Sequence, residues 1–231
     1  MSVKMKIDIG AVIPARLGSS RVKDKVFVSI DGVETLLERK IKQLRKILPV
    51  DRVVVNTESE KIAELALSCG ASVKFRDVAY SIGHEKTFSE LVEHVVKSLD
   101  FEHVAWTPFV VPFLGTKEFQ SAFETYERDI VALGKFDSLV SVVPLKEYLW
   151  FKGKPLNYEA NKNHTISQEL PDWVKVTNGL YMASKETMLL ERYILGKTVF
   201  LNENESKCGV DIDTLFDVEI AKAYAKVLIE N

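Results

Sequence analysis

The segment from Ile13 to Lys25 carries the densest group of side chains that could do chemistry in this sequence. It begins Ile-Pro-Ala-Arg-Leu-Gly-Ser-Ser-Arg and ends at Lys25. Backbone N–H groups of a loop rich in Gly and Ser can bind a phosphate, and Arg16, Arg21 and Lys25 would add positive charge. The spacing matches neither a Walker loop nor a dinucleotide fingerprint, so a basic surface loop with a glycine turn remains the alternative.

A second group lies near the C-terminus, in the stretch Val210-Asp211-Ile212-Asp213-Thr214. If this stretch is extended, Asp211 and Asp213 project from the same face and offer two hard oxygen ligands suited to Mg²⁺. In the alternative, Asp213 or Thr214 caps a following helix whose first turn holds acidic residues. The residues alone leave both interpretations open.

A third group is Thr177-Asn178-Gly179-Leu180-Tyr181, where Asn-Gly interrupts a stretch with the character of a strand. A glycine there allows a ligand to approach the backbone closely, whereas a plain turn is the simpler interpretation. The four histidines lack the spacing of a zinc site, and no Ser/His/Asp order is apparent. Histidine–metal chemistry and hydrolase triads are therefore not expected.

Alternating strands and helices would hold these groups in place. Because the alternation runs along most of the chain, we predict an α/β fold with a mainly parallel sheet and helices on both of its faces, making three layers. The loop after the first strand would then lie at the carboxyl edge of the sheet, where ligands bind. The predicted strands are 7–15, 52–56, 71–75, 103–107, 138–143, 176–183, 198–201 and 210–213, and the predicted helices are 36–47, 58–68, 88–99, 117–126, 185–193 and 215–229.

The pattern changes within residues 145–175, which are polar and aromatic and contain Gly153, Pro155 and Pro171. We interpret this stretch as an arm inserted into a single domain that spans residues 1–231. An arm of this kind commonly meets another subunit or covers a site.

Composition excludes several classes of function. The chain has 231 residues, with 31 Lys and Arg against 33 Asp and Glu, and this net charge of −2 with no basic stripe gives no basis for nucleic-acid binding. The longest apolar run, 104–114, is about half the length of a membrane span and contains two prolines, so no membrane segment is expected. Two cysteines and an N-terminus unlike a secretory leader favour a cytoplasmic protein.

Taken together, the motifs resemble those of the acylneuraminate cytidylyltransferases, which activate sialic acids as CMP-sugars, and more distantly those of the 3-deoxy-manno-octulosonate cytidylyltransferases. Five stretches fall in the order of the family: Ile13-Pro14-Ala15-Arg16-x-Gly18-Ser19, the run from Asp51 to Ala63, Gln168-x-Leu170-Pro171, Asn178-Gly179-x-Tyr181 and Asp211-Ile212-Asp213-Thr214. The resemblance covers nearly the whole chain.

The resemblance implies a Rossmann-like nucleotidyltransferase fold, of the nucleotide-diphospho-sugar transferase type, that forms a homodimer through the arm. It implies Mg²⁺-dependent transfer of CMP from CTP to a 2-keto sugar acid, with release of pyrophosphate, to supply a CMP-sugar for surface glycans. By the same resemblance Arg16, Arg21, Lys25 and Asp211 would serve catalysis, and Asp211 with Asp213 would hold the metal. The nucleotide would contact Ala15, Arg16, Gly18, Ser19, Ser20, Lys25, Arg76 and Ser89, and the sugar acid would contact Gln168, Asn178 and Gly179.

Three stretches depart from the family pattern, chiefly at the sugar site. Residues 107–114 replace the usual Gln-Pro-Thr-Ser-Pro-Leu-Arg stretch, Ile166-Ser167 stands where an arginine often precedes the glutamine, and Ser20-Arg21 replaces Lys-Gly. An unusual nonulosonate or another sugar acid is therefore the expected acceptor. Three alternatives stay open: a nucleotidyltransferase for a sugar or polyol phosphate, a GT-A glycosyltransferase using the Asp-x-Asp pair, and a nucleotide-binding relative without activity.

Overall fold

The computed structural model describes residues 6–19, 21–81 and 85–230. The strands in these ranges are β1 (Ile9–Pro14), β2 (Val53–Thr57), β3 (Ser72–Phe75), β4 (His103–Trp106), β5 (Ser138–Leu145), β6 (Trp150–Phe151), β7 (Lys154–Pro155), β8 (Trp173–Ser184) and β9 (Val199–Glu203). The α-helices are α1 (Leu36–Arg45), α2 (Glu60–Ser68), α3 (Phe88–Lys97), α4 (Thr116–Thr125), α5 (Lys185–Glu191) and α6 (Leu215–Glu230).

Local sequence sets where several helices begin and end. The side chains of Thr35 and Thr87 each accept a hydrogen bond from the backbone N–H of a glutamate three residues on. The carboxylate of that glutamate accepts one from the N–H of the threonine, so α1 and α3 both start with a capping box. Ser59 caps α2 in the simpler way, through the N–H of Ile62. Gly70 follows the end of α2 with a φ of 75°, a conformation that favours glycine.

The sheet of seven strands has the order β3-β2-β1-β4-β8-β5-β9. β1, β2, β3 and β4 run parallel to one another, β5 pairs in parallel with β9, and β8 is antiparallel to both of its neighbours. The prediction of a mainly parallel sheet is confirmed. The carboxyl ends of β1, β3 and β4 consequently meet at one edge, which is where the site described below lies.

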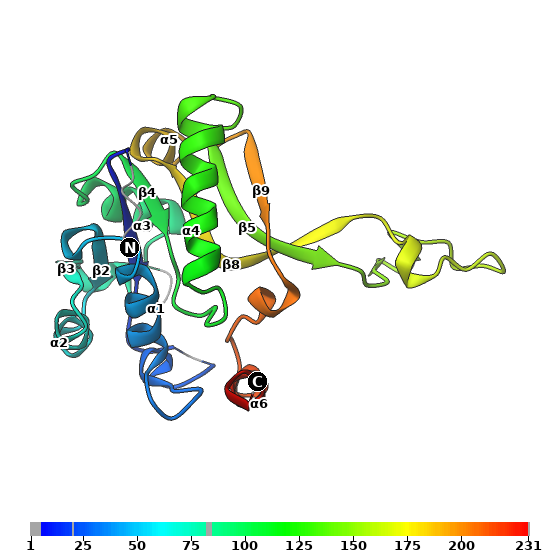
Figure 1. Cartoon of the computed structure of the whole chain (residues 1–231), viewed down its shortest axis with the longest axis horizontal. Coiled ribbons are helices and arrows are strands. Elements are labelled where there is room, and N and C mark those ends of the chain that lie inside the picture. The colour runs from blue at the N-terminus through cyan, green and yellow to red at the C-terminus, as the bar shows by residue number, and fades with distance from the viewer. Residues whose placement is uncertain (1–5, 20, 82–84, 231) are drawn as a thin grey trace.

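Helices cover both faces of the sheet, as predicted (Figure 1). Alternate strand residues enter two separate cores: Ala11, Ile13, Val53 and Val55 face α1, α2, α4 and α6, whereas Val12, Val54, Val104 and Trp106 face α3 and α5. This alternation is the period of two that a strand buried on both sides requires. None of the helices in the described ranges has the length and apolar character needed to cross a membrane.

Two predicted elements differ from the observed ones. The helix predicted to end at Tyr126 continues as a π-helical segment, Tyr126–Ala132, in which Tyr126 is fully buried and its hydroxyl lies 3.0 Å from Nδ1 of His103. Residues 210–213 were predicted as a strand but join no sheet, because the N–H of Ile212 donates to the carbonyl of Val110 in a loop rather than to a strand.

The segment between β5 and β8 projects away from the body of the molecule (Figure 1). β5 and β8 stay paired as far as Leu145 and Trp173, so the base of this arm continues the sheet. Farther out, β6 and β7 pair only with each other. Aromatic side chains here remain open to solvent, with Trp150 56% exposed and Phe151 58% exposed.

Candidate functional site

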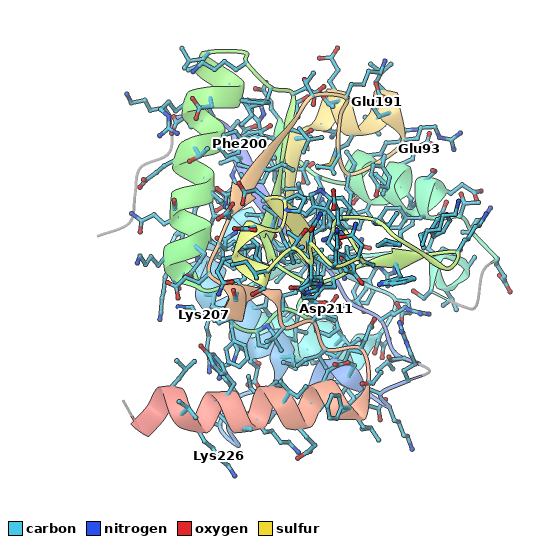
Figure 2. The ribbon with its side chains drawn as sticks, turned by 90° about the vertical axis from the view of Figure 1, so that its right-hand side faces the viewer. Glu93, Glu191, Phe200, Lys207, Asp211 and Lys226 are labelled. Atoms are coloured by element: carbon cyan, nitrogen blue, oxygen red, sulfur yellow. The ribbon has the colours of Figure 1, made fainter. Side chains whose placement is uncertain are left out.

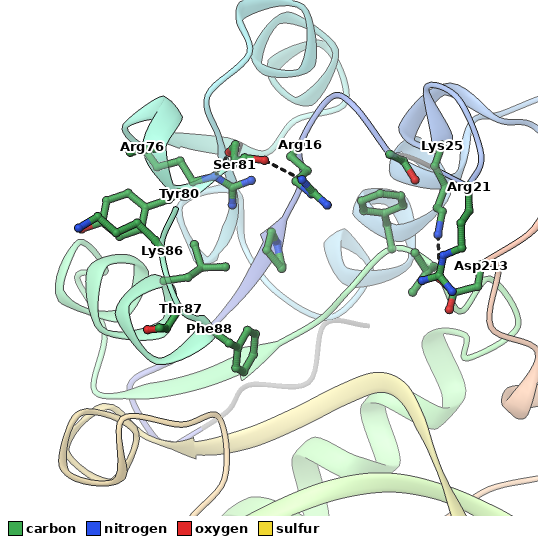
Figure 3. Close-up of a pocket in the computed structure, with 16 residues that line it drawn as sticks. Arg16, Arg21, Lys25, Arg76, Tyr80, Ser81, Lys86, Thr87, Phe88 and Asp213 are labelled. Carbon is green, nitrogen blue, oxygen red and sulfur yellow. Dashed lines mark hydrogen bonds and ion pairs between the residues drawn. The ribbon is translucent and has the colours of Figure 1, made fainter. Parts of the chain in front are cut away.

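A cleft of about 470 Å³ lies at the edge of the sheet where β1, β3 and β4 end. This is the position at which open α/β sheets bind ligands. Figure 3 shows its side chains in two groups, with Lys25, Arg21 and Asp213 at one end, Arg76, Tyr80, Lys86 and Thr87 at the other, and Arg16 between them. The lining residues are Pro14, Arg16, Ser19, Arg21, Lys25, Arg76, Ala79, Tyr80, Ser81, Lys86, Thr87, Phe88, Leu91, Phe109, Val110 and Asp213.

The basic loop after β1 supplies much of the charge in the cleft. Arg16 is exposed and donates to the carbonyl of Ser81 at 2.6 Å, while Lys25 is buried and donates to the carbonyl of Ile212 at 2.6 Å. Among the lining residues that the structure describes, five are basic and one, Asp213, is acidic. A cleft of this size with such a positive field suits an anion with several phosphate charges.

Arg76 is a buried hub rather than a free recognition group. It donates to the hydroxyl of Ser81 at 2.9 Å, the side-chain oxygen of Asn56 at 3.2 Å and the carbonyl of Ala15 at 3.1 Å. Glu58 completes its shell at 3.2 Å and also accepts from the N–H of Leu17 at 2.9 Å. Arg76 therefore holds the loop after β1 through the carbonyl of Ala15, and most of its N–H donors already have partners.

Glu58 was not among the predicted site residues. Burial acts to raise its pKa, but hydrogen bonds from Ser81 and Leu17 and the charge of Arg76 outweigh burial and hold the pKa below its usual value. The carboxylate is therefore ionised and links the loop after β1 to the segment after β3. Residues 58 and 76 belong to different strand–loop units, so no spacing along the chain pairs them.

The acidic pair is not consumed by capping the C-terminal helix. Thr214 caps α6: the N–H of Asp217 donates to its hydroxyl at 3.3 Å, and Asp217 accepts from the N–H of Thr214 at 2.7 Å. This reciprocal arrangement satisfies the helix start without Asp211 or Asp213. Of the two alternatives in the sequence, the capping role falls to Thr214.

Asp211 lies on the sheet side of α6 (Figure 2) with an incomplete set of partners. Its Oδ2 accepts from the side-chain amide of Asn178 at 3.4 Å, whereas its buried Oδ1 has no hydrogen-bond partner. Burial and the neighbouring charge of Asp213 raise the pKa of Asp211 to about 6. An unpartnered buried carboxylate oxygen beside a second carboxylate fits a bound cation.

Asp213 faces the cleft and already has cationic partners. Its Oδ1 lies 3.1 Å from both the guanidinium of Arg21 and the ammonium of Lys25. Within the described part of the chain no cluster of three His, Cys, Asp or Glu side chains gathers around a metal position. The pair therefore fits Mg²⁺, which commonly takes one or two protein carboxylates and fills its other positions with water and substrate phosphates.

Asn178 and Gly179 form a bulge in β8 rather than a plain turn. The register with β5 shifts between Val140 and Val142, and Asn178 has a φ of 56°. The side chain of Asn178 donates to Asp211 and accepts from the hydroxyl of Tyr181 at 3.3 Å. Neither residue lines the cleft itself, and Asn178 contacts Asp211, so the implied contacts of both residues with the sugar acid stay a prediction.

Gly179 allows a close approach of the loop that follows β4. A Cβ at this position would lie 2.8 Å from Cδ2 of Leu114 and 3.2 Å from Cβ of Val111. We expect Gly179→Ala to lower the free energy of unfolding by about 1–3 kcal/mol, because the loop 107–114 would have to move to relieve the overlap. Urea unfolding of the variant and the wild type measures this difference, and equal midpoints would show that the contact is not restrictive.

The remaining predicted residues divide between those inside and outside the cleft. Ser19 lines it, Ala15 is buried behind it and contributes a carbonyl to Arg76, and Gly18 turns the loop with a φ of 74°. Ser20 lies outside the described residues. Ser89 does not line the cleft, and Gln168 is exposed on the arm, so neither joins this site within one chain.

Thr87, Tyr80 and Lys86 line the cleft but were not predicted. The sequence did hold a signal for Thr87, since Thr-x-x-Glu marks the start of a helix and the first turn of α3 opens at the edge of the sheet. Ser89 lies inside that helix, two residues past the cap. Tyr80 stacks on His94 with ring centroids 4.2 Å apart, a contact between segments that no local pattern reveals.

Residues 107–114 give the cleft an apolar wall. Phe109 and Val110 face it from the loop after β4, where a polar stretch was expected from the family pattern. The backbone of this loop is joined to the acidic segment, because the N–H of Ile212 donates to the carbonyl of Val110 at 2.9 Å. One wall of the cleft and the carboxylate pair are thus parts of the same packed unit.

Comparison with known proteins gives consistent findings. A sequence profile for cytidylyltransferases matches residues 10–149, which is more than half of the chain. The chain is 25% identical over 234 residues to a pseudaminic acid cytidylyltransferase of Campylobacter jejuni, covering 95% of this chain and 97% of that protein.

Two solved structures share the fold. A CMP:2-keto-3-deoxy-manno-octonic acid synthetase complexed with CTP has a TM-score of 0.65 and 15% identity, and the match covers 96% of this chain and 99% of that one. A 4-diphosphocytidyl-2C-methyl-D-erythritol synthase from Anaerococcus prevotii has a TM-score of 0.60 and 16% identity, with 95% and 99% covered. The α/β architecture is therefore the same in all three.

Proposed function

This chain belongs to the cytidylyltransferase family, and we propose that it joins CMP from CTP to a hydroxyl group of a 2-keto sugar acid and releases pyrophosphate. The observation that carries the proposal is the meeting, at one edge of the sheet, of the basic loop and the carboxylate pair. A triphosphate needs the positive charge of the basic loop, and a metal ion that accompanies it needs the carboxylate pair.

We propose that CTP lies along the cleft with its triphosphate toward Lys25 and Arg21 and its base toward Arg76, Tyr80 and Thr87. The positive end of the cleft supports this orientation, because Lys25 and Arg21 share Asp213 as their partner (Figure 3). The two cations would turn from Asp213 to the phosphate oxygens when the nucleotide enters. Asp213 would then be free to serve as a metal ligand.

In the proposed reaction the acceptor hydroxyl attacks the α-phosphorus, the bond from this phosphorus to the bridging oxygen breaks, and the hydroxyl proton passes to solvent. Arg16, Arg21 and Lys25 hold the charge that develops on the phosphate oxygens. Asp211 and Asp213 would hold Mg²⁺, which when bound neutralises phosphate charge and lowers the pKa of the attacking hydroxyl. Asn178 keeps Asp211 oriented through its amide.

The acceptor we propose is a nonulosonate with few hydroxyl groups near the wall formed by Phe109 and Val110. Both side chains face the cleft, and an apolar wall favours methyl or acyl substituents over hydroxyls. The relative from Campylobacter jejuni named for pseudaminic acid supports a sugar acid of this class. A polyol phosphate is the second candidate, supported by the likeness in fold to a structure named as a 2-C-methyl-D-erythritol 4-phosphate cytidylyltransferase.

An acceptor panel tests this part of the proposal. CTP and MgCl₂ would be incubated with pseudaminic acid, N-acetylneuraminate, 3-deoxy-manno-octulosonate and 2-C-methylerythritol 4-phosphate, and products would be identified by mass. We expect a CMP conjugate from one 2-keto acid, with the highest kcat/KM for the least hydroxylated. A product from the polyol phosphate alone would replace the sugar acid by the second candidate.

We also propose that the protein is a homodimer formed through the arm. An isolated pair of strands such as β6 and β7 is marginally stable by itself, and the arm leaves Trp150, Phe151, Leu156 and Ile166 at least half exposed.

Two free cysteines, Cys69 and Cys208, and a soluble nucleotide as substrate favour a cytoplasmic setting.

Light scattering tests the dimer. The wild type is expected at twice 26.1 kDa, and the double variant Trp150→Ser with Phe151→Ser is expected as a monomer, because the apolar contact would be lost. Leu190→Ser is the matched control, since Leu190 is 76% exposed on α5 in the body of the molecule. A wild-type monomer, or a double variant that stays dimeric, would contradict the role of the arm.

A further inference from the structure

The loop 110–114 has no regular structure, yet each of its five backbone carbonyls accepts a hydrogen bond from another part of the chain. Two donors come from the C-terminal segment: the N–H of Ile212 to Val110 at 2.9 Å and the thiol of Cys208 to Phe113 at 3.4 Å. The others come from α1, where Gln43 donates to Pro112 at 3.0 Å and Lys40 donates to both Val111 and Leu114.

Lys40 is the unusual member of this set. Its side chain is fully buried, and its Nζ lies 3.1 Å from the carbonyl of Val111, 3.4 Å from that of Leu114 and 4.5 Å from the ring centroid of Phe119. Among the ion pairs of the described residues none includes Lys40. When protonated, Lys40 therefore has carbonyl dipoles and an aromatic face, and no carboxylate among the described residues, as its partners.

A buried ammonium without an anion opposes folding. Burial lowers the pKa of Lys40 to about 7, and burial raises the pKa of the nearby Cys208 thiol to about 11, so this thiol is neutral and offers no counter-charge. A methionine would fill nearly the same volume without the cost of desolvating a charge. What Lys40 provides that methionine cannot is a donor shared between two carbonyls of the loop.

We propose that Lys40 is a positioning residue that fixes the loop 110–114. Through this loop it would also hold in place the apolar wall formed by Phe109 and Val110 and the carboxylate pair of Asp211 and Asp213. The contacts form a continuous path: Lys40 holds Val111, the adjacent Val110 faces the cleft, and its carbonyl accepts from Ile212, between Asp211 and Asp213. Lys40 itself does not line the cleft. The effect on activity rests on the proposed function, whereas the effect on the loop does not.

The test compares Lys40→Met with Lys46→Met, a lysine exposed at the end of the same helix. Hydrogen exchange read by mass spectrometry should show at least about threefold faster uptake in peptides covering residues 108–115 of Lys40→Met, and no change in Lys46→Met. The midpoint of thermal unfolding should change little, because the relief from desolvating the ammonium is offset by the carbonyls of Val111 and Leu114 that lose their donor. The KM for the acceptor should increase about tenfold, with the KM for CTP within about twofold of the wild type.

A second variant, Gln43→Leu, keeps the test decisive if Lys40→Met fails to fold. Gln43 holds a single carbonyl of the loop, so faster exchange confined to the same peptides is expected with a smaller increase. Unchanged exchange in the loop in both variants, or a lower unfolding midpoint that accounts for the loss of activity, would overturn the proposal. Should the wild type transfer no cytidylyl group, the exchange measurement still decides the role of Lys40 while the proposed function fails separately.

Discussion

Replacing Asp211 by asparagine is expected to reduce Mg²⁺-dependent turnover at least about a hundredfold while leaving unfolding cooperative. The variant keeps the shape of the side chain but loses the charge that a divalent cation needs, and loss of one such electrostatic contact typically costs two to three orders of magnitude. Pyrophosphate release measured over a range of MgCl₂ concentrations gives the change in turnover.

The same substitution, Asp211→Asn, should leave the stability of the protein against unfolding equal or higher, although turnover falls. The pKa of Asp211 in the folded protein is raised to about 6, above its value in an unfolded chain, so the folded state binds this proton more tightly. Stability from this group is then present at low pH and is lost as the pH rises through 6. At pH 8, where Asp211 is ionised, the asparagine variant should unfold at the same or a higher urea concentration than the wild type in the absence of metal.

Asp217→Asn is the control for the alternative role of this segment. Asp217 belongs to the cap of α6 and its carboxylate also accepts from the N–H of Asp213 at 3.1 Å, so its replacement should cost about 1 kcal/mol of stability and lower turnover far less than Asp211→Asn. If Asp211→Asn and Asp213→Asn both kept activity near that of the wild type, the carboxylate pair would have no part in metal binding.

The second large effect is expected from Lys25→Met, which should lower kcat/KM for CTP by about two to three orders of magnitude. Lys25 is buried, and the carbonyl of Ile212 and the carboxylate of Asp213 orient its ammonium into the cleft. A preorganised cation of this kind stabilises charge that develops on the phosphates at little cost in reorganisation. Initial rates at varied CTP concentration separate the change in kcat from the change in KM.

Lys23→Met provides the matched control, because Lys23 is an exposed lysine of the same loop and does not line the cleft. Its kcat/KM should stay within about twofold of the wild type. Equal losses in both variants would mean that the loop acts through its overall charge, and the specific placement of Lys25 would then have no special effect.

Much of the fold follows from short-range rules. Capping boxes at Thr35 and Thr87 begin two helices, and buried runs such as Val53 to Val55 mark parallel strands covered on both faces. The place of the basic loop follows as well, since a loop after the first strand of such a sheet opens at its carboxyl edge. For these features sequence pattern and tertiary structure agree.

The parts of the site that sequence reasoning missed depend on contacts between distant segments. One of them is the bulge in β8, which directs Asn178 to Asp211 and brings Gly179 against Leu114. Residues far apart in the chain are likewise joined by the ion pair of Glu58 with Arg76 and by the hydrogen bond from Lys40 to the carbonyl of Val111. No spacing along one helix or strand encodes such pairs, because their partners are fixed by how the layers pack.

The most direct test of the central claim is pyrophosphate release measured with CTP, UTP, GTP and ATP in turn, each with Mg²⁺ and the panel of 2-keto sugar acids. We predict release with CTP alone, dependent on one sugar acid and matched mole for mole by a CMP-sugar identified by mass. Release with another nucleotide, or with CTP only when a sugar phosphate is added, would contradict the proposed reaction. Binding of CTP without release for any acceptor would equally contradict it and would point to a nucleotide-binding protein without this activity.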